Sequence, residues 1–379
     1  MRRTTLTISA LTLIASAGLL TAGPLTPPAG PVTPTYKTLA EVEARTPISS
    51  LPFNITQPGS YYLTKSLSVQ GTLNGITVSN SFVTIDLNGF TLTGGGTGNA
   101  IGISAQGVSF LTVKNGTVRN FAYQGINTSG SGRSWLENVS VESCGNGGII
   151  TGPSSTVLNC KSSFNTGWGI LVNDGCRVVN CLASNNGTLS TDGGIYAAPR
   201  STITGCTASY NTGLGIWATI DTIATGCKAD YNIGYGIQAS NNSVVERSVC
   251  TNNSLAGIYA DSEVTIRHNT CNANGVDGIH VDSGGTVIRN SCHANGPTNG
   301  GAGIRLTSEK TFVDNNDLAG NYCGILAPAG TAWNIITRNT AHTNNLDIEV
   351  AGANVVGPVL ASPSNNGWFD VSSWANIAY

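Results

Sequence analysis

One pattern of polar and apolar residues recurs through the middle of the chain and predicts how it folds. The pattern is Asn-x-x-x-Gly-Ile, with Asn165, Gly169 and Ile170 as one example. Its Gly-Ile pairs follow one another at steps of 21, 25, 21, 21, 21, 21, 25 and 21 residues, beginning at Gly148, Gly169, Gly194, Gly215, Gly236, Gly257, Gly278, Gly303 and Gly324. The two longer steps hold polar inserts near Gly187–Ser190 and near Pro297–Gly300. A short fixed period with loop insertions indicates a repeat array in which each repeat forms one coil of a solenoid.

Alternation inside each repeat predicts short strands. The first and third residues after the refrain glycine are small or apolar, as in the pairs Ile170/Val172 and Ile258/Ala260. Such period-two alternation is typical of a strand with one buried face. Each repeat has room for about three strands, and stacked coils are expected to lie ~4.8 Å apart. We expect the refrain glycine where a Cβ would not fit, and the refrain asparagine in a turn, bonded to neighbouring coils or its own backbone.

Two neighbouring columns of small residues run through the repeats. The first lies five residues before the refrain asparagine and contains Cys160, Cys181, Cys206, Cys227, Ser248, Asn269, Asn290, Asn315 and Asn339. The second lies two residues further on and contains Ser162, Ala183, Ala208, Ala229, Cys250, Cys271 and Cys292. We interpret the cysteines as small buried apolar side chains in a narrow interior. A metal or redox array is one alternative. Disulfides are the other, although stacked Cβ atoms at ~4.8 Å exceed the ~3.5–4.5 Å of a disulfide.

The ends of the chain differ in composition from the repeats. Arg2 and Arg3 precede an apolar run over 6–20, which indicates a secretory signal peptide. An uncleaved anchor is the alternative, but the run is shorter than the ~20 residues of a spanning helix, and no other segment is expected to span a bilayer. The expected organisation is a signal peptide over 1–23, a proline-rich linker over 24–37, a cap and first coils over 38–100 with a short helix over 39–45, repeats over 101–350, and a C-terminal cap or tail over 351–379. Export would make the protein secreted, periplasmic or bound at the cell surface.

Composition excludes one class of partner. Only 10% of the residues are charged, compared with about 25% in ordinary globular proteins. The formal net charge is −2, so the chain offers no basic field for nucleic acid. The sequence leaves the oligomeric state open.

The repeats resemble a known family. The Asn-x-x-x-Gly-Ile refrain, the asparagine column of residues 269–339 and the variant Asn344-Asn-Leu-Asp347-Ile are similar to the right-handed parallel β-helix repeats of the pectate-lyase-like superfamily. The resemblance covers about residues 75–350. It implies an all-β, right-handed parallel β-helix solenoid of roughly 12 coils with a short N-terminal cap. It implies less about function, because lyases, hydrolases, epimerases and adhesins share the fold.

One outward-facing column beside the refrain carries most of the candidate chemistry. We call it the outer strip, and it contains Ile150, Leu171, Tyr196, Trp217, Gln238, Tyr259, His280, Arg305 and Leu326. Tyr196, Trp217 and Tyr259 are candidates to stack on sugar rings, and Arg305 is a candidate partner for a carboxylate of the same glycan. The candidate catalytic residues are His280, Asp282 and Arg305. The candidate metal ligands are Asp261, Asp277 and Asp282, with Ca²⁺ as the one candidate cofactor.

Each surface has an alternative interpretation. In the alternative interpretation, the outer strip is a solvated face with scattered charges and strand-favouring aromatics that binds no ligand. A second row, Arg247, His268, Arg289 and Asp314, is interpreted as solvated charge, with a second binding surface as its alternative.

Two functions follow from the sequence. The first is an exported, non-catalytic β-helix that has a structural role or binds glycans at the cell envelope. The second is a carbohydrate-active enzyme (a polysaccharide lyase, hydrolase or epimerase) that acts on acidic polysaccharide. The Asn-Thr-Asp, Asp-Asp, His-Gly and Arg-Ile-Lys motifs of several hydrolases in the superfamily are absent from the sequence, which favours the first. The two short inserts predict only a shallow wall beside the outer strip.

Overall fold

The computed structural model describes residues 43–296, 300–361 and 373–378. The chain divides into one unit of residues 1–44 and another of residues 45–379, and the fold below is that of the second. The predicted signal peptide, the proline-rich linker and most of the predicted helix over 39–45 lie outside the described residues, and residues 43–45 are not helical. The described residues contain no helix with the length and hydropathy of a membrane span.

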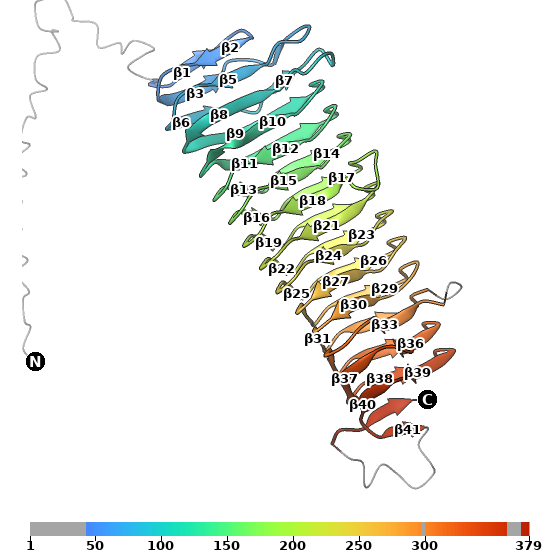
Figure 1. The fold of residues 1–379 in the computed structure, drawn as a ribbon. Helices are drawn as coiled ribbons and strands as arrows, with labels where there is room; N and C mark the ends of the chain where they lie inside the picture. Colours follow the sequence, from blue (N-terminus) through green and yellow to red (C-terminus); the bar gives the residue numbers. More distant parts are fainter. Residues whose placement is uncertain (1–42, 297–299, 362–372, 379) are drawn as a thin grey trace, which may run out of the picture. The chain divides into compact units, whose positions relative to one another are not determined.

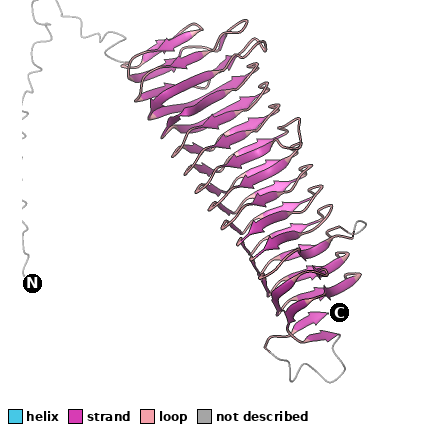
Figure 2. Cartoon of the chain, viewed as in Figure 1, coloured by secondary structure: helices cyan, strands magenta, loops and turns pink. Residues whose placement is uncertain are grey.

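The described chain forms strands and turns only, and the strands assemble into two parallel sheets (Figures 1 and 2). Sheet B has one strand in each coil: β2 (Phe53–Ile55), β5 (Ile76–Val78), β8 (Ile103–Ser109), β10 (Ile126–Gly132), β12 (Ile149–Thr151), β15 (Ile170–Val172), β18 (Gly193–Ala197), β21 (Leu214–Ala218), β24 (Ile237–Ala239), β27 (Ile258–Ser262), β30 (Ile279–Ser283), β33 (Ala302–Leu306), β36 (Cys323–Ala327) and β39 (Leu346–Val350).

Sheet A has two strands in most coils, which form two arms. The first arm contains β1 (Thr46–Ile48), β3 (Gly59–Leu63), β6 (Val83–Asp86), β13 (Thr156–Leu158), β16 (Arg177–Val179), β19 (Thr202–Thr204), β22 (Ile223–Thr225), β25 (Val244–Glu246), β28 (Thr265–Arg267), β31 (Thr286–Ile288), β34 (Phe312–Asp314), β37 (Ala332–Thr337) and β40 (Ala353–Val356). The second arm contains β4 (Leu67–Ser68), β7 (Thr91–Thr93), β14 (Lys161–Ser163), β17 (Leu182–Ser184), β20 (Thr207–Ser209), β23 (Lys228–Asp230), β26 (Val249–Thr251), β29 (Thr270–Asn272), β32 (Ser291–His293), β35 (Asp317–Ala319), β38 (Thr340–His342), β41 (Val359–Ala361) and β42 (Asn376–Ala378). Two longer strands, β9 (Leu111–Arg119) and β11 (Trp135–Glu142), run through both arms.

Each coil runs from a sheet B strand through the two arms of sheet A and back to sheet B. Strands β12, β13 and β14 form one such coil, and each pairs in parallel with its counterpart in the next, β15, β16 and β17. From β13 to β38, one residue of positive φ turns the chain from the first arm to the second, for example Asn180 with φ 51° and His268 with φ 56°. We call this turn the bend. The parallel β-helix predicted from the repeats is confirmed.

The stack has more coils than predicted. Sheet B contains 14 strands, one per coil, where roughly 12 coils were expected. The difference lies in residues 46–100, which the sequence suggested as a cap merging into the repeats. These residues already form coils, because β2, β5 and β8 pair in register with one another.

The interior is filled by columns of like residues. The refrain isoleucines are fully buried in ten successive coils: Ile126, Ile149, Ile170, Ile195, Ile216, Ile237, Ile258, Ile279, Ile304 and Ile325. Burial of such a side chain stabilises the fold by about 1.5–3 kcal/mol. The inward column of the second arm stays small, from Ala183 to Cys292. All ten cysteines are free and buried, as the interpretation of small apolar side chains predicted.

A ladder of buried asparagine amides connects the coils at the turn before sheet B. It contains Asn165, Asn186, Asn211, Asn232, Asn253, Asn274, Asn295, Asn321 and Asn344. Asn253 is typical. Its Oδ1 accepts hydrogen bonds from the backbone N and the Nδ2 of Asn232, at 3.1 and 3.0 Å, and its Nδ2 donates to Ala229 O and to Asn274 Oδ1, each at 3.0 Å. The prediction that the refrain amide bonds to neighbouring coils is confirmed.

A second ladder corrects one position of the predicted alignment. The cysteine column does continue through Ser248, Asn269 and Asn290, but the next member is Asn316, whose Oδ1 accepts from Asn290 N at 2.9 Å. The predicted member, Asn315, is exposed at the bend with φ 56°. The turn after β33 is one residue longer than the corresponding turn of the preceding coil, and this moves strands β34 and β35 one position along the sequence. The next predicted member, Asn339, is in the ladder, where its Oδ1 accepts from Asn316 N at 3.0 Å.

The same shift corrects the predicted row of exposed charges. Arg247, His268 and Arg289 do lie at successive bends, but the row continues to Asn315. Asp314 instead ends strand β34 and is 6% exposed, with its carboxylate bound by Arg338 at 2.6 Å.

The three cysteines that fitted neither predicted column have places in the stack. Cys144 takes the position of a refrain asparagine, and its backbone N donates to Asn165 Oδ1. Cys176 belongs to a ladder of hydroxyl side chains and accepts from Ser155 N through its Sγ at 3.2 Å. Cys323 begins strand β36.

The refrain glycine is required by close packing between coils. A Cβ on Gly194 would lie 2.6 Å from the carbonyl oxygen of Gly215 in the next coil and 2.8 Å from the amide nitrogen of Asn211. The asparagine ladder and the glycine column therefore depend on each other, and this explains why the two residues recur together.

Removing one rung of the ladder should destabilise the protein. Asn253→Ala leaves the backbone N and side-chain amide of Asn232 buried without an acceptor, so we expect a loss of about 2–4 kcal/mol in the free energy of unfolding. Urea denaturation followed by circular dichroism measures it. The matched control is Asn252→Gly, because Asn252 is exposed with φ 55°, a conformation that glycine adopts freely. Equal losses in the two variants would contradict the assigned role of the ladder.

The cysteines should be unreactive in the native protein. Burial raises the pKa of Cys144 to about 11 and that of Cys227 to about 12, so little thiolate forms near neutral pH. We expect a disulfide reagent at pH 8 to label almost none of the ten thiols in buffer and all ten in denaturant. Rapid labelling of several thiols in the native state would contradict the buried columns.

Candidate functional site

Parallel pairing aligns the outer strip along sheet B. Leu171 pairs with Tyr196, Tyr196 with Trp217, and Trp217 with Gln238. The column continues through Tyr259, His280 and Arg305 in the three following coils. Neighbouring coils are ~4.8 Å apart, so the side chains form one continuous row on the outer face, as the sequence predicted.

Three aromatic rings pack together at one part of the strip. Tyr196 and Trp217 meet edge to face, with ring centroids 5.2 Å apart, and Trp168 lies 5.6 Å from Tyr196 and 6.4 Å from Trp217. All three side chains are only half-buried. The sequence analysis missed Trp168, which precedes the refrain glycine Gly169. The position before the refrain glycine also faces outward, and an aromatic residue there is the sequence signal that could have identified Trp168.

An apolar pocket lies beside these rings. Its volume is about 340 Å³, and its lining includes Leu214, Trp217, Ile233 and Tyr235. Ser190 and Thr191 of the first insert form part of its wall. The insert therefore deepens the face of sheet B at the aromatic rings, and the predicted wall is present there. The pocket is at the small end of the ~300–1,000 Å³ range of ligand sites.

A buried carboxylate organises the polar end of the strip. Asp277 is fully buried, and its Oδ1 accepts from the backbone N of Ala302 at 2.7 Å. Arg305 Nε donates to both carboxylate oxygens, at 3.0 and 2.9 Å, and His280 Nδ1 lies 3.0 Å from Oδ2. Burial raises the pKa of Asp277, but the hydrogen bonds from His280, Arg305 and Ala302 outweigh it and hold the pKa below its usual value.

The second insert takes part in the same cluster. Arg305 Nη2 donates to the carbonyl oxygen of Gly300, the last residue of that insert, at 2.9 Å. The guanidinium of Arg305 is thus held by Asp277 and Gly300, and its side chain is 21% exposed. It presents a fixed positive charge at the surface of the strip rather than a mobile one.

A tyrosine and a second carboxylate face this cluster. Tyr259 donates its hydroxyl proton to Asp282 Oδ2 at 2.6 Å, and Thr307 Oγ1 donates to Asp282 Oδ1 at 3.0 Å. His280 Nε2 lies 3.6 Å from the same Oδ1. Tyr235, which the sequence analysis also missed, stacks on Tyr259 with centroids 4.7 Å apart. Burial, and next the hydrogen bond to Asp282, raise the pKa of Tyr259, so its hydroxyl stays protonated.

The three candidate metal-ligating carboxylates lie in two different environments. Asp261 and Asp282 lie in adjacent coils, at positions between the paired Ala260/Val281 and Ser262/Ser283. Burial and then the charge of Asp282 raise the pKa of Asp261. Both oxygens of Asp277 are already bound by side chains and backbone. Over residues 43–296, 300–361 and 373–378, no group of three or more His, Cys, Asp or Glu side chains is arranged to hold a metal ion.

Comparison with known proteins identifies the fold. The family model described as "Right handed beta helix region" matches residues 58–202 and 188–318. Among solved structures, the chain is similar to the periplasmic alginate epimerase AlgG, with a TM-score of 0.51 and 14% identity over 86% of this chain and 78% of that one. It is also similar to a tailspike protein of E. coli bacteriophage HK620, with a TM-score of 0.51 and 10% identity over 85% and 71% of the two chains. At these identities the similarity concerns the fold alone. No curated protein sequence matches the chain.

The Asp277 cluster yields a stability prediction. Asp277→Asn leaves Arg305 without a counter-charge, so we expect a loss of about 2–3 kcal/mol at pH 7, below the ~3–5 kcal/mol of fully buried pairs because Arg305 retains solvent contact. The folded pKa is depressed, so the wild-type advantage is present above the unfolded pKa of about 3.9 and shrinks as pH falls through the folded pKa.

Urea denaturation at pH 7 and at pH 3 measures both effects. The matched control is Asp261→Asn, which removes a carboxylate whose pKa is raised and should leave stability at pH 7 unchanged or slightly higher. A loss in the Asp277 variant that did not diminish at low pH would show that charge is not the cause.

Proposed function

We propose, from the premise that this chain belongs to the right-handed β-helix family, that the outer strip of sheet B binds a polysaccharide. One observation carries the proposal. Half-buried aromatic rings and fixed polar groups follow one another along a single face for six coils, from Tyr196 to Arg305. Charged residues make up only 10% of the chain, and Asp277, Asp282 and Arg305 lie together with His280 at one end of this row. Scattered surface residues would not be expected to concentrate in this way.

The aromatic end of the strip suits the apolar faces of sugar rings. Trp217 and Tyr196 each leave part of the ring exposed, and the adjacent pocket is lined mainly by apolar side chains. Packing of a ring against an aromatic face contributes about 0.5–1.5 kcal/mol beyond the area it buries. Repeated stacking sites along a linear row favour a linear ligand over a single small molecule.

The polar end of the strip suits a carboxylate-bearing sugar. Arg305 and His280 offer a fixed cation and a ring nitrogen beside the strip, while Asp282 offers an acceptor for sugar hydroxyls. Because Arg305 is bound to Asp277, we propose it as an electrostatic neighbour of an acidic sugar rather than as a free guanidinium fork. The proposed role is thus that of an exported, non-catalytic protein that binds acidic polysaccharide at the cell envelope. The proposal of export is based only on the sequence of residues 1–23.

One arrangement favours a catalytic role as the second candidate. Buried Asp277 orients His280 through Nδ1, which leaves Nε2 facing the strip, and the protonated hydroxyl of Tyr259 lies in the next coil. An oriented imidazole beside a proton donor is what proton abstraction next to a carboxylate requires. This candidate would make the protein a lyase or epimerase of acidic polysaccharide, with His280 and Tyr259 as the acid–base pair.

Replacing one tryptophan tests the binding site. Trp217→Ala should weaken binding of a galacturonate hexamer and of a neutral galactan oligosaccharide by about tenfold each, because stacking contributes about 0.5–1.5 kcal/mol in addition to buried apolar area. Isothermal titration calorimetry measures both. The matched control is Trp135→Ala, since Trp135 is 42% exposed on sheet A, away from the strip. Equal affinities in the two variants would contradict the proposed site.

The same oligosaccharides distinguish the two candidate functions. If the protein only binds, mass spectrometry and NMR after long incubation return the hexamer unchanged. Unsaturated ends or inverted C5 centres would establish catalysis instead. The double variant Asp277→Asn/Arg305→Gln removes the cation together with its counter-charge, and it should weaken binding of the acidic hexamer more than that of the neutral one.

A further inference from the structure

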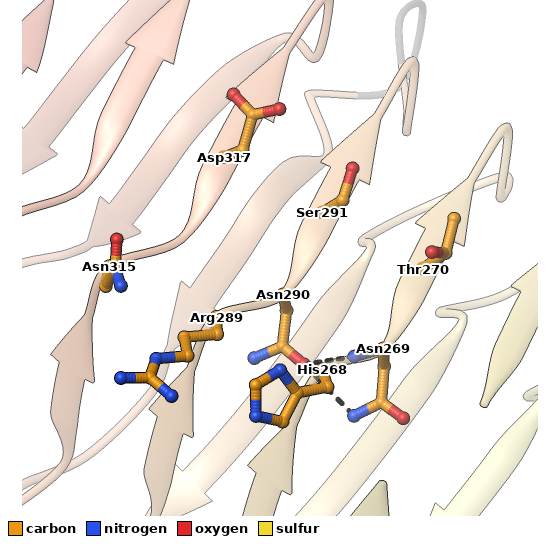
Figure 3. Close-up of a pocket in the computed structure, with 8 residues that line it drawn as sticks. All are labelled: His268, Asn269, Thr270, Arg289, Asn290, Ser291, Asn315 and Asp317. Carbon is orange, nitrogen blue, oxygen red and sulfur yellow. Dashed lines mark hydrogen bonds between the residues drawn. The ribbon is translucent and has the colours of Figure 1, made fainter. Parts of the chain in front are cut away.

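A polar groove follows the bend of sheet A in the C-terminal coils. It has a volume of about 400 Å³ and lies on strands and turns that contribute nothing to the outer strip. Figure 3 shows Arg289 and His268 side by side at two successive bends, with Thr270 and Ser291 on the strands that follow. The asparagines between them, Asn269 and Asn290, are bound to each other within the interior ladder, so they form the floor and keep the register of the groove.

The charge of the groove differs between coils. A second groove at the same bend, of about 330 Å³, lies further toward the N-terminus and presents Asn138 and Asn159 where the C-terminal groove presents Arg289 and His268, and Lys161 where that groove presents Asp317. Those asparagines are residues for which positive φ costs little. The C-terminal groove therefore has its basic side chains at the bends and a carboxylate on the following strand, whereas the second groove has uncharged amides at the bends and a lysine on the strand.

Arg289 has an unusual environment for an arginine at the bend. At the same position in other coils, Arg247 is paired with Glu246 at 3.1 Å and Arg338 with Asp314 at 2.6 Å. Arg289 and His268 are exposed, and their side chains make no hydrogen bond or ion pair with any described residue. A guanidinium and an imidazole that face one groove with hydroxyl groups around them can bind an anionic group by charge-assisted hydrogen bonds.

The groove also holds an acceptor. Asp317 lies on the strand after the next bend, and its carboxylate is 3.0 Å from His293 Nε2 and 3.6 Å from His342 Nε2. A carboxylate repels a uniform polyanion but accepts hydrogen bonds from hydroxyl groups. The combination favours a ligand that carries an anionic group and hydroxyls in alternation along its length, and it disfavours nucleic acid.

We propose that this groove is a second binding site, for an acidic glycan that runs parallel to the helix axis across the bends of residues 268, 289 and 315. An anionic group of the glycan, a carboxylate or a sulfate ester, is held by Arg289 and His268. Hydroxyls of the adjoining sugar donate to Asp317 and Asn315. The coil rise of ~4.8 Å is comparable to the length of one sugar in an extended chain, so successive coils meet successive sugars. The site is independent of the outer strip.

The test uses a protein in which the outer strip is already weakened. In a Trp217→Ala background, a galacturonate hexamer and its methyl-esterified form are titrated by calorimetry, because the two differ only in charge at the carboxyl groups. We expect Arg289→Ala to weaken binding of the free acid by about tenfold or more, the effect of one charge-assisted contact of about 1.5–3 kcal/mol, and to leave the weak binding of the ester unchanged. Arg289→Lys should retain part of the affinity.

Arg177→Ala is the matched control, since Arg177 is an exposed arginine of sheet A outside the groove. Equal losses in Arg289→Ala and Arg177→Ala would mean general attraction to a basic surface and would overturn the proposal. Equal losses for the acid and its ester would also overturn it. Tight binding of a single-stranded oligonucleotide through Arg289 would overturn the assignment to a glycan. In the Trp217→Ala background, a loss of acid binding in Arg289→Ala that Arg177→Ala does not share supports this site whether or not the outer strip binds sugars.

Discussion

From Asn186 to Asn321, each buried asparagine of the main ladder uses its side-chain hydrogen bonds on the coils before and after it. Asn253 accepts twice through Oδ1 and donates twice through Nδ2, all at 3.0–3.1 Å. A coil that slipped by one residue would leave several buried polar groups unpaired, at a cost of about 1–3 kcal/mol each. The amides therefore fix the register of the turns, and through them the register of both sheets. Every aligned column on the surface, including the outer strip, depends on this constraint.

The same constraint explains how far the sequence could predict the structure. Asparagine, glycine and isoleucine recur together because a Cβ at Gly194 would collide with the neighbouring coil. The period of the repeat could therefore be predicted from the sequence alone. The alignment failed where a coil gained a residue in the turn after β33, and Asn316 took the place expected for Asn315. The Gly-Ile step stays at 21 residues there, because the segment from Asn321 to Gly324 is one residue shorter than in the regular refrain. Residues 46–100 lack a clean refrain, which is why the sequence predicted a cap and first coils there without the number of coils.

The sequence could predict which side chains of the candidate site share a column, but not which side chains of different columns contact each other. The column from Tyr196 to Arg305 follows from period-two alternation and parallel stacking. The ion pair between Arg305 and Asp277 does not, because it joins side chains on different columns of adjacent coils. Trp168 and Tyr235 share with Asp277 the position before the refrain glycine, and their ring contacts likewise join side chains of different columns. Contacts across columns depend on rotamers and on the inserts, which periodicity does not specify.

The side chains proposed to bind ligands lie on two separate surfaces, the outer strip of sheet B and the groove at the bend of sheet A. The outer strip combines rings with a clamped cation, and the bend of sheet A combines a free guanidinium with hydroxyls and a carboxylate. Both run along the helix axis with one side chain per coil, a spacing that suits extended polymers. The most direct test is a crystal structure of the protein with a galacturonate hexamer. We expect electron density for sugar rings along sheet B, with one ring packed against Trp217 and a carboxylate near Arg305. A saturated crystal with an empty outer strip would contradict the proposed function.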